Sequence, residues 1–217
     1  MGLQNFQKHP PKLTNFNISG LPLISDIGII TCIEAIAPYI NTLDMSLLTP
    51  TNVTDAIGDA LKKCVLLEIL DLSGCSDISD DCFKKMFPED KPDEKDIKKP
   101  LLKVLCVNNL QYISEECFIK IINVFSLLKK VELINGYIGD QFLEELGHSD
   151  SEIKYLNMNL CSTVTKEGVE KLKALKPSCV VIWEAPRKVE KRDNGLRMPL
   201  LLKKKKKKKA KKSSKKK

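Results

Sequence analysis

The feature that most constrains the fold is a phrase of apolar residues that recurs six times along the chain. At Leu67–Ile78 it reads L-x-x-L-x-L-x-x-C-x-x-I, and it is followed by Ser79 and Asp80. Similar spacings begin at positions 13, 40, 102, 128 and 153, so the starts lie 27, 27, 35, 26 and 25 residues apart. A unit of this length cannot bury a core alone, and arrays of such units form solenoids in which each unit packs against its neighbours.

Each unit has a direct structural interpretation. Alternate leucines such as Leu70 and Leu72 predict a short strand whose alternate side chains point into the core. The cysteine, Cys75 in this unit, is expected to turn inward where the strand ends. A Ser or Thr followed by an acid, here Ser79 and Asp80, then predicts the start of a helix that one of the two side chains caps. The sequence leaves open which of the two is the cap.

The predicted helices share an inward face. Its two rows lie three residues apart, which is helical spacing. The rows hold Ile29, Phe83, Phe118, Leu143 and Val169, and then Cys32, Leu61, Met86, Ile121, Leu146 and Leu172. Gly58 interrupts the first row. The pattern therefore predicts an α/β solenoid with a curved parallel sheet on the concave side and helices on the convex side.

Over residues 13–183 the phrase CSDISDDCF and its five counterparts resemble the cysteine-containing leucine-rich repeats of F-box/leucine-rich-repeat proteins and of the antagonist-of-mitotic-exit-network family. The resemblance implies a leucine-rich-repeat fold. It also implies a protein-binding role, because those families mostly recognise substrates for Skp–cullin ubiquitin ligases or act as related binding modules. Only 12 residues precede the first repeat, so we expect no F-box. The D-D-C and E-E-C phrases also resemble mitochondrial proteins similar to ATP synthase subunit s, although the first residues lack the arginines of a presequence.

The repeats set the expected domain boundaries. Residues 1–12 are expected to form an N-terminal cap, and residues 13–186 the repeat domain with a closing strand at 179–183. Trp183 is expected to cover the open end of the core. Residues 87–100 explain the long step of 35 residues, because their three prolines and nine charged residues predict a solvated loop.

Charge is segregated along the chain. Residues 187–217 hold 17 lysines and arginines and two acids, whereas residues 1–186 hold 19 basic and 26 acidic residues, a net charge of −7. The tail cannot bury a core, so we expect it to be disordered. Nuclear import, binding of RNA or DNA, and attachment to an anionic membrane surface all fit its charge. We favour import, which fits lysine runs such as KKKKKKK, and no lipidation site supports the membrane. The lysines that would carry this role are Lys203, Lys204, Lys205, Lys206, Lys207, Lys208, Lys209, Lys211 and Lys212.

The cysteines and the missing motifs narrow the class of protein. The eight cysteines include no C-x-x-C pair, and there is neither a secretory signal nor an apolar stretch that could span a membrane, so we expect reduced, buried thiols in a nuclear or cytoplasmic protein. Nucleotide-binding, zinc-protease and serine-hydrolase motifs are missing, and His9 and His148 do not recur with the repeat. We expect no enzymatic activity, no cofactor and no metal. The acid pairs at 80–81 and 115–116 fit helix starts better than a catalytic dyad.

The remaining candidate site is the outer face of the predicted sheet, on the concave side of the solenoid. Its residues form a polar strip that is short of arginine and aromatic side chains. Such a strip suits hydrogen bonding to a protein segment, and its acids favour a basic one, whereas a phosphate backbone calls for lysine and arginine. We expect a monomer that binds a protein partner there. The candidate contact residues are Asn17, Asp44, Asp71, Glu132, Tyr155 and Asn157.

Three functions follow from these observations and from the resemblance. The first is a non-enzymatic adaptor or substrate-recognition-like protein, related to the ubiquitin-ligase leucine-rich-repeat subunits, that needs a partner chain to reach a ligase. The second is a nuclear or nucleolar protein that associates with nucleic acid through the lysine-rich tail. The third is a mitochondrial assembly factor resembling ATP synthase subunit s.

Overall fold

A computed structural model describes most of the chain in two separate units. The units are residues 1–184 and 185–217. The residues whose structure is described are 10–21, 24–48, 53–87, 101–184, 190–191 and 197–198. Most of the predicted N-terminal cap, the charged segment at 88–100 and the nine selected lysines of the tail therefore lie outside the described residues.

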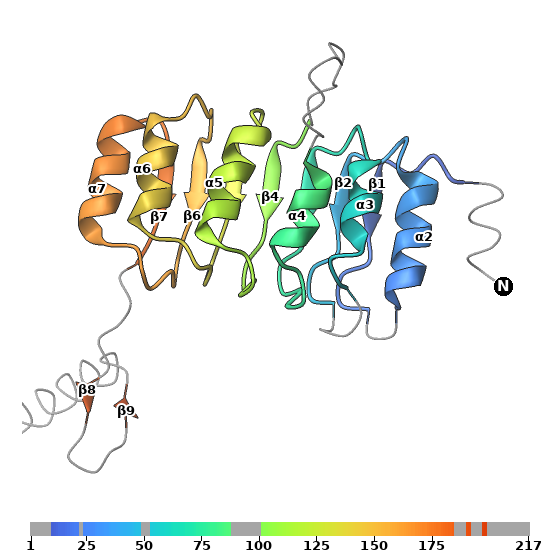
Figure 1. Cartoon of the computed structure of the whole chain (residues 1–217), viewed down its shortest axis with the longest axis horizontal. Coiled ribbons are helices and arrows are strands. Elements are labelled where there is room, and N and C mark those ends of the chain that lie inside the picture. Colours follow the sequence, from blue (N-terminus) through green and yellow to red (C-terminus); the bar gives the residue numbers. More distant parts are fainter. Residues whose placement is uncertain are drawn as a thin grey trace, which may run out of the picture. The chain divides into compact units, whose positions relative to one another are not determined.

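The first unit contains a single parallel sheet of seven strands in sequence order. The strands are β1 Asn15–Asn17, β2 Thr42–Asp44, β3 Ile69–Asp71, β4 Val104–Cys106, β5 Lys130–Glu132, β6 Tyr155–Asn157 and β7 Val180–Ile182. The helices are α2 Asp26–Ile36, α3 Ile57–Lys62, α4 Asp80–Met86, α5 Glu115–Val124, α6 Asp140–His148 and α7 Lys166–Leu175. Figure 1 shows these helices along one face of the sheet. The predicted α/β leucine-rich-repeat solenoid is confirmed.

The strand register follows the apolar phrase of the repeat. The middle residue of each strand pairs with the middle residue of the next, as Leu43 does with Leu70 and Leu70 with Leu105. These three side chains are fully buried. Because side chains alternate along a strand, the flanking residues of each strand lie on the face opposite to the helices. The closing strand predicted at 179–183 is β7, and Trp183 packs against the end of the core as expected.

A shared turn follows six of the strands. Its second residue has a positive φ in every repeat, at Gly20, Leu47, Gly74, Asn109, Asn135 and Leu160. Glycine and asparagine adopt this conformation at little cost, whereas a leucine is strained in it. Immediately after the turn, the thiols of Cys75 and Cys161 donate to the carbonyls of Met45 and Leu133 in the preceding repeat, at 3.1 and 3.2 Å. The inward-turning cysteine of the repeat therefore links the turn after its own strand to the residue that follows the strand of the preceding repeat.

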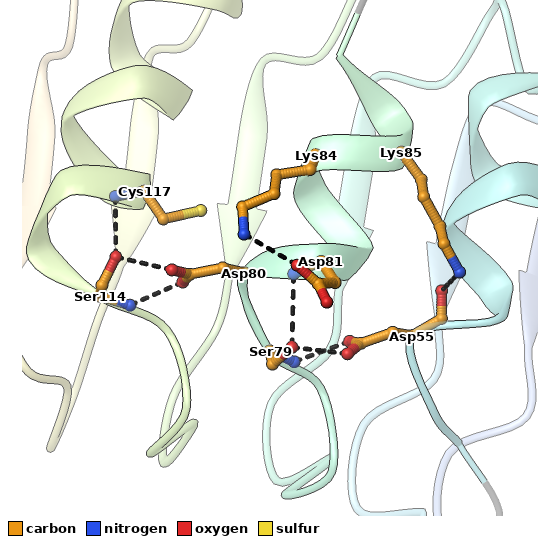
Figure 2. Close-up of polar contacts among 8 residues, drawn as sticks. All are labelled: Asp55, Ser79, Asp80, Asp81, Lys84, Lys85, Ser114 and Cys117. Atoms are coloured by element: carbon orange, nitrogen blue, oxygen red, sulfur yellow. Dashed lines mark hydrogen bonds and ion pairs between the residues drawn. The ribbon is translucent and has the colours of Figure 1, made fainter.

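The structure shows which residue of each Ser/Thr–acid pair caps the helix. The hydroxyls of Ser25, Ser79, Ser114 and Thr165 accept backbone N–H groups of α2, α4, α5 and α7, so the Ser or Thr is the cap. The acid that follows reaches the next repeat instead. The carboxylate of Asp80 accepts both the N–H and the hydroxyl of Ser114, each at 2.7 Å (Figure 2).

This inter-repeat carboxylate bridge recurs along the array. The same two hydrogen bonds link Asp26 to Thr54, Asp55 to Ser79, and Asp140 to Thr165. Glu115 accepts the N–H groups of Gly139 and Phe142 in the same place, since Gly139 has no hydroxyl. The sixth repeat has Lys166 where the others have an acid. No seventh helix follows it among the described residues, so an acid at 166 has no cap to reach.

The packing of the core explains one irregular residue and corrects the prediction for another. Gly58, which interrupts the helical row, is needed for close packing, because a Cβ there would lie 2.5 Å from the carbonyl oxygen of Cys82 in α4. Phe87, placed by the sequence at the start of the solvated loop, is 5% exposed and packs with Phe125, with ring centroids 6.1 Å apart. Phe87 therefore belongs to the core, although the segment that follows it is rich in charged residues.

The second unit contains one element that the sequence did not predict. The short strands β8 Glu190–Lys191 and β9 Arg197–Met198 pair antiparallel within the segment expected to be disordered. Only five residues separate them, so the loop-closure entropy that opposes their pairing is small. The expectation of disorder is therefore wrong for these four residues.

Candidate protein-binding surface

The candidate surface is the face of the sheet opposite to the helices, here called the outer face. Strand pairing aligns its side chains in two rows across the seven strands. The first row holds Asn15, Thr42, Ile69, Val104, Lys130, Tyr155 and Val180, and the second row holds Asn17, Asp44, Asp71, Cys106, Glu132, Asn157 and Ile182. The six residues that the sequence selected therefore lie on one face, five of them in the second row and Tyr155 in the first.

Most of the second-row side chains hold the turn that follows their own strand. The side-chain oxygens of Asn17, Asp44 and Asp71 accept the N–H of the residue two positions later, at 2.8, 2.9 and 2.8 Å. Asn157 accepts the N–H of Asn159 in the same way, at 3.2 Å. This is the hydrogen bond of an Asx turn, and asparagine and aspartate make it equally well. These residues therefore have a structural role before any binding role.

The fourth and fifth strands use a different residue for the same purpose. Cys106 cannot accept this bond, and Asn108 instead bridges the two repeats: its amide oxygen accepts the N–H of Ile134 at 2.8 Å. The amide nitrogen of Asn108 donates to Ser73 and to Glu132, at 3.1 and 3.3 Å. Asn108 is not among the six residues predicted from the sequence. Its repeat position, two residues after the second row, was the available signal.

The charges of the outer face are distributed unevenly. Lys130 forms an ion pair with Glu132 at 2.9 Å, and its ammonium lies 5.1 Å from the ring centroid of Tyr155. Asp44 and Asp71 are register partners on β2 and β3. Neither makes an ion pair with a cation among the described residues. The negative charge without a counter-charge therefore lies on β2 and β3, and Glu132 is already neutralised by its neighbour.

The selected residues differ in how much of their surface a partner could reach. Asn17 is exposed, and Asp44, Asp71, Glu132 and Tyr155 are half-buried. Asn157 is only 9% exposed and its oxygen is occupied, so it is positioned for the turn more than for a partner.

The thiols are buried wherever the structure places them. All eight cysteines are free and buried. Burial raises the pKa of Cys64 and Cys75 to about 12. Burial, and after it the negative charges of Asp71 and Glu132, raises the pKa of Cys106 to about 12. Thiols with these pKa values are protonated at neutral pH and are poor nucleophiles.

The histidine of the described residues and their acids give no sign of a catalytic or metal site. The ring nitrogen Nδ1 of His148 lies 2.9 Å from the carbonyl oxygen of Glu144 in its own helix. Within the described ranges, no three His, Cys, Asp or Glu side chains gather in an arrangement that could hold a metal ion. The helices of those ranges are also too short or too polar to cross a bilayer.

No family model matches the chain, and no curated protein matches it significantly. Among solved structures it is similar to a chain in the crystal structure of the yeast Rad7 and Elc1 complex, with a TM-score of 0.46 and 16% identity over 83% of this chain and 58% of that chain. It thus spans less than two thirds of that relative. It is also similar to leiomodin-1 actin-binding site 2, with a TM-score of 0.40 and 10% identity over 81% of this chain and 86% of that one. The fold assignment rests on the chain's own sheet and helices.

Proposed function

We propose that this protein is a non-enzymatic interaction module that binds a protein partner on the outer face of its sheet. The observation that supports the proposal most directly is a row of turn-forming side chains fixed by hydrogen bonds on a face that none of the helices α2 to α7 covers. Side chains held in one geometry lose little conformational entropy on binding, which favours affinity. The finer proposal is an adaptor or substrate-recognition-like role beside a ubiquitin ligase, suggested by the resemblance of the repeats.

The experiment compares partner capture by two matched triple variants of the full chain. Asn15→Arg, Thr42→Arg and Val104→Arg place three bulky side chains on the first row. The side chains of these three residues make no hydrogen bond with the part of the chain that the structure describes. The control places three arginines on exposed helix positions, at Asn123→Arg, Gln141→Arg and Ala174→Arg. Both triples add the same charge. Proteins captured by the native chain and by the control, but lost with the outer-face triple, support the proposal.

A captured set that is the same for both triples contradicts the outer-face proposal. Subunits of a cullin ligase among the proteins lost with the outer-face triple would support the adaptor role, and their absence there would count against it. An adaptor should also keep its partner when the chain is shortened to residues 1–184, the unit that contains the whole sheet and its core.

The lysine-rich tail supports a second candidate function. Residues 187–217 carry 17 basic and two acidic residues, which is the composition of a segment that holds nucleic acid through counterion release. If this were the working part, material retained by the full chain would be lost with residues 185–217 and would wash off steeply with salt. The mitochondrial alternative predicts uptake of the chain by isolated mitochondria, and failure of uptake excludes it.

A further inference from the structure

The outer face has two halves with different electrostatics. On β5 and β6 the charges are paired internally, since Lys130 contacts both Glu132 and Tyr155. On β2 and β3 the carboxylates of Asp44 and Asp71 are register partners. Adjacent strands lie about 4.8 Å apart. Like charges directly opposite one another on a sheet destabilise it, and a cation between them would relieve the repulsion.

The hydrogen bonds of these two aspartates leave acceptor capacity that faces outward. Asp44 accepts the Ser46 N–H on one oxygen and the Asn17 side-chain amide on the other, at 2.9 and 2.8 Å. Asp71 accepts the Ser73 N–H on Oδ1, at 2.8 Å, and its Oδ2 makes no hydrogen bond with the described residues. Each carboxylate oxygen can accept more than one hydrogen bond. The pair is therefore oriented by the turns and is still able to bind a donor.

An apolar strip lies beside the aspartates on the same face. Ile69 and Val104 are register partners on β3 and β4, and each is two residues before the second-row residue of its strand, Asp71 or Cys106. Ile69 is 37% exposed, and the side chains that precede it in the first row, Asn15 and Thr42, are polar. Cys106 extends the strip as a small, nearly covered group. An apolar centre with polar groups at its rim is the usual composition of a protein-binding interface.

Resting on the proposed function, we propose that the β2–β4 part of the outer face binds a protein segment that carries an aliphatic residue followed, two positions later, by lysine or arginine. The aliphatic side chain lies against Ile69 and Val104, and the cation lies between Asp44 and Asp71. The spacing follows from the strand: side chains two residues apart on one face are separated by about 6.6 Å, and an extended partner running along β3 has the same repeat. A charge-assisted contact to two carboxylates sets the preference for a basic partner.

The test is an NMR titration of the full chain with a defined peptide. The probe is an eight-residue synthetic peptide with leucine and lysine two positions apart in an otherwise Ser/Gly sequence, and the comparison peptide has glutamate in place of lysine. The expected result is a set of shifted amide signals on β2, β3 and β4 with the lysine peptide only. The double variant D44N and D71N should weaken binding about tenfold, as the sum of two partly desolvated charge pairs. Asn17 and Asn157 show that asparagine preserves the turn hydrogen bond, so these variants should keep the fold.

Two controls separate the site from general electrostatics. Ile69→Ser should weaken binding about fivefold by removing apolar contact without changing charge. The pair Asp59→Asn and Glu170→Gln changes the net charge equally at exposed helix positions and should leave the affinity unchanged. Equal weakening by both double variants, shifts confined to β5 and β6, or no shift at millimolar peptide would each overturn this inference. The capture experiment is independent of it: partners still lost with the outer-face triple would then uphold the proposed function with a different partner chemistry.

Discussion

Two neighbouring aspartates of α4 allow a sharp test of the inter-repeat carboxylate bridge, because only one of them forms such a bridge. Asp80 reaches across to Ser114, whose N–H and hydroxyl it accepts at 2.7 Å each. Asp81 points to solvent and contacts Lys84 of its own helix at 2.8 Å (Figure 2). Both acids lie in the first turn of the same helix and experience the same helix dipole. Replacing either one by alanine removes the same charge from nearly the same place.

The two substitutions should differ widely in their effect on stability. A hydrogen bond to a charged group contributes about 1.5–3 kcal/mol, and partial exposure of the bridge reduces the combined value for Asp80→Ala to about 2–3 kcal/mol. For a domain of this size 1 kcal/mol shifts the Tm by about 2–4 °C, so we expect Asp80→Ala to lower the Tm by about 4–12 °C. Asp81→Ala should leave the Tm almost unchanged, because exposed ion pairs contribute little.

Urea unfolding of both variants, together with Ser114→Ala and the Asp80→Ala/Ser114→Ala double variant, completes the assay. The double-mutant cycle should give a coupling free energy of about 1–2 kcal/mol between Asp80 and Ser114. Equal destabilisation by Asp80→Ala and Asp81→Ala, or a coupling near zero, would refute the bridge as a source of stability. The acids at the helix starts would then act through the helix dipole alone.

Three further predictions test the core, the strand-exit turn and the buried thiols. Phe118→Ala should cost about 3–5 kcal/mol in urea unfolding, because the ring is 2% exposed and packs edge-on against Phe142, and a surface-like effect would contradict the repeat register. Leu160→Asn should raise the free energy of unfolding by about 0.5–1 kcal/mol, since Leu160 has a φ of 67° and is 61% exposed, whereas a loss of stability would show that its side chain makes a needed contact. Burial raises the pKa of Cys64 and Cys75 from the ordinary value of 9.0 to about 12, so the unfolded chain releases protons that the folded chain retains, and the Tm should fall as pH rises from 9 to 12. Cys75→Ala should make that fall shallower, and an unchanged slope would exclude this thiol as a cause.

Much of this fold could be predicted because the apolar pattern that determines it is local and recurs in six repeats. The spacing of Leu67, Leu70 and Leu72 determines which side chains of a strand are buried, and the same spacing in the other repeats determines the register of the sheet. The helical rows and the closing strand follow from the same periodicity. The members of the outer-face rows could also be named in advance, since alternation along a strand is a property of the backbone.

The roles of those residues were decided only by the tertiary structure. Asp80 and Asp81 are neighbours in the sequence, yet one bridges two repeats and the other faces water, because only one carboxylate is directed at a cap 34 residues away. Asp71 and Glu132 occupy the same row, yet Lys130 neutralises only the second. Gly58 is explained by a carbonyl of the following helix. The sequence by itself determined which face each residue occupies, through a local period. The structure decided what each side chain contacts, because its partners belong to the neighbouring repeat and are positioned by the packing of one unit on the next.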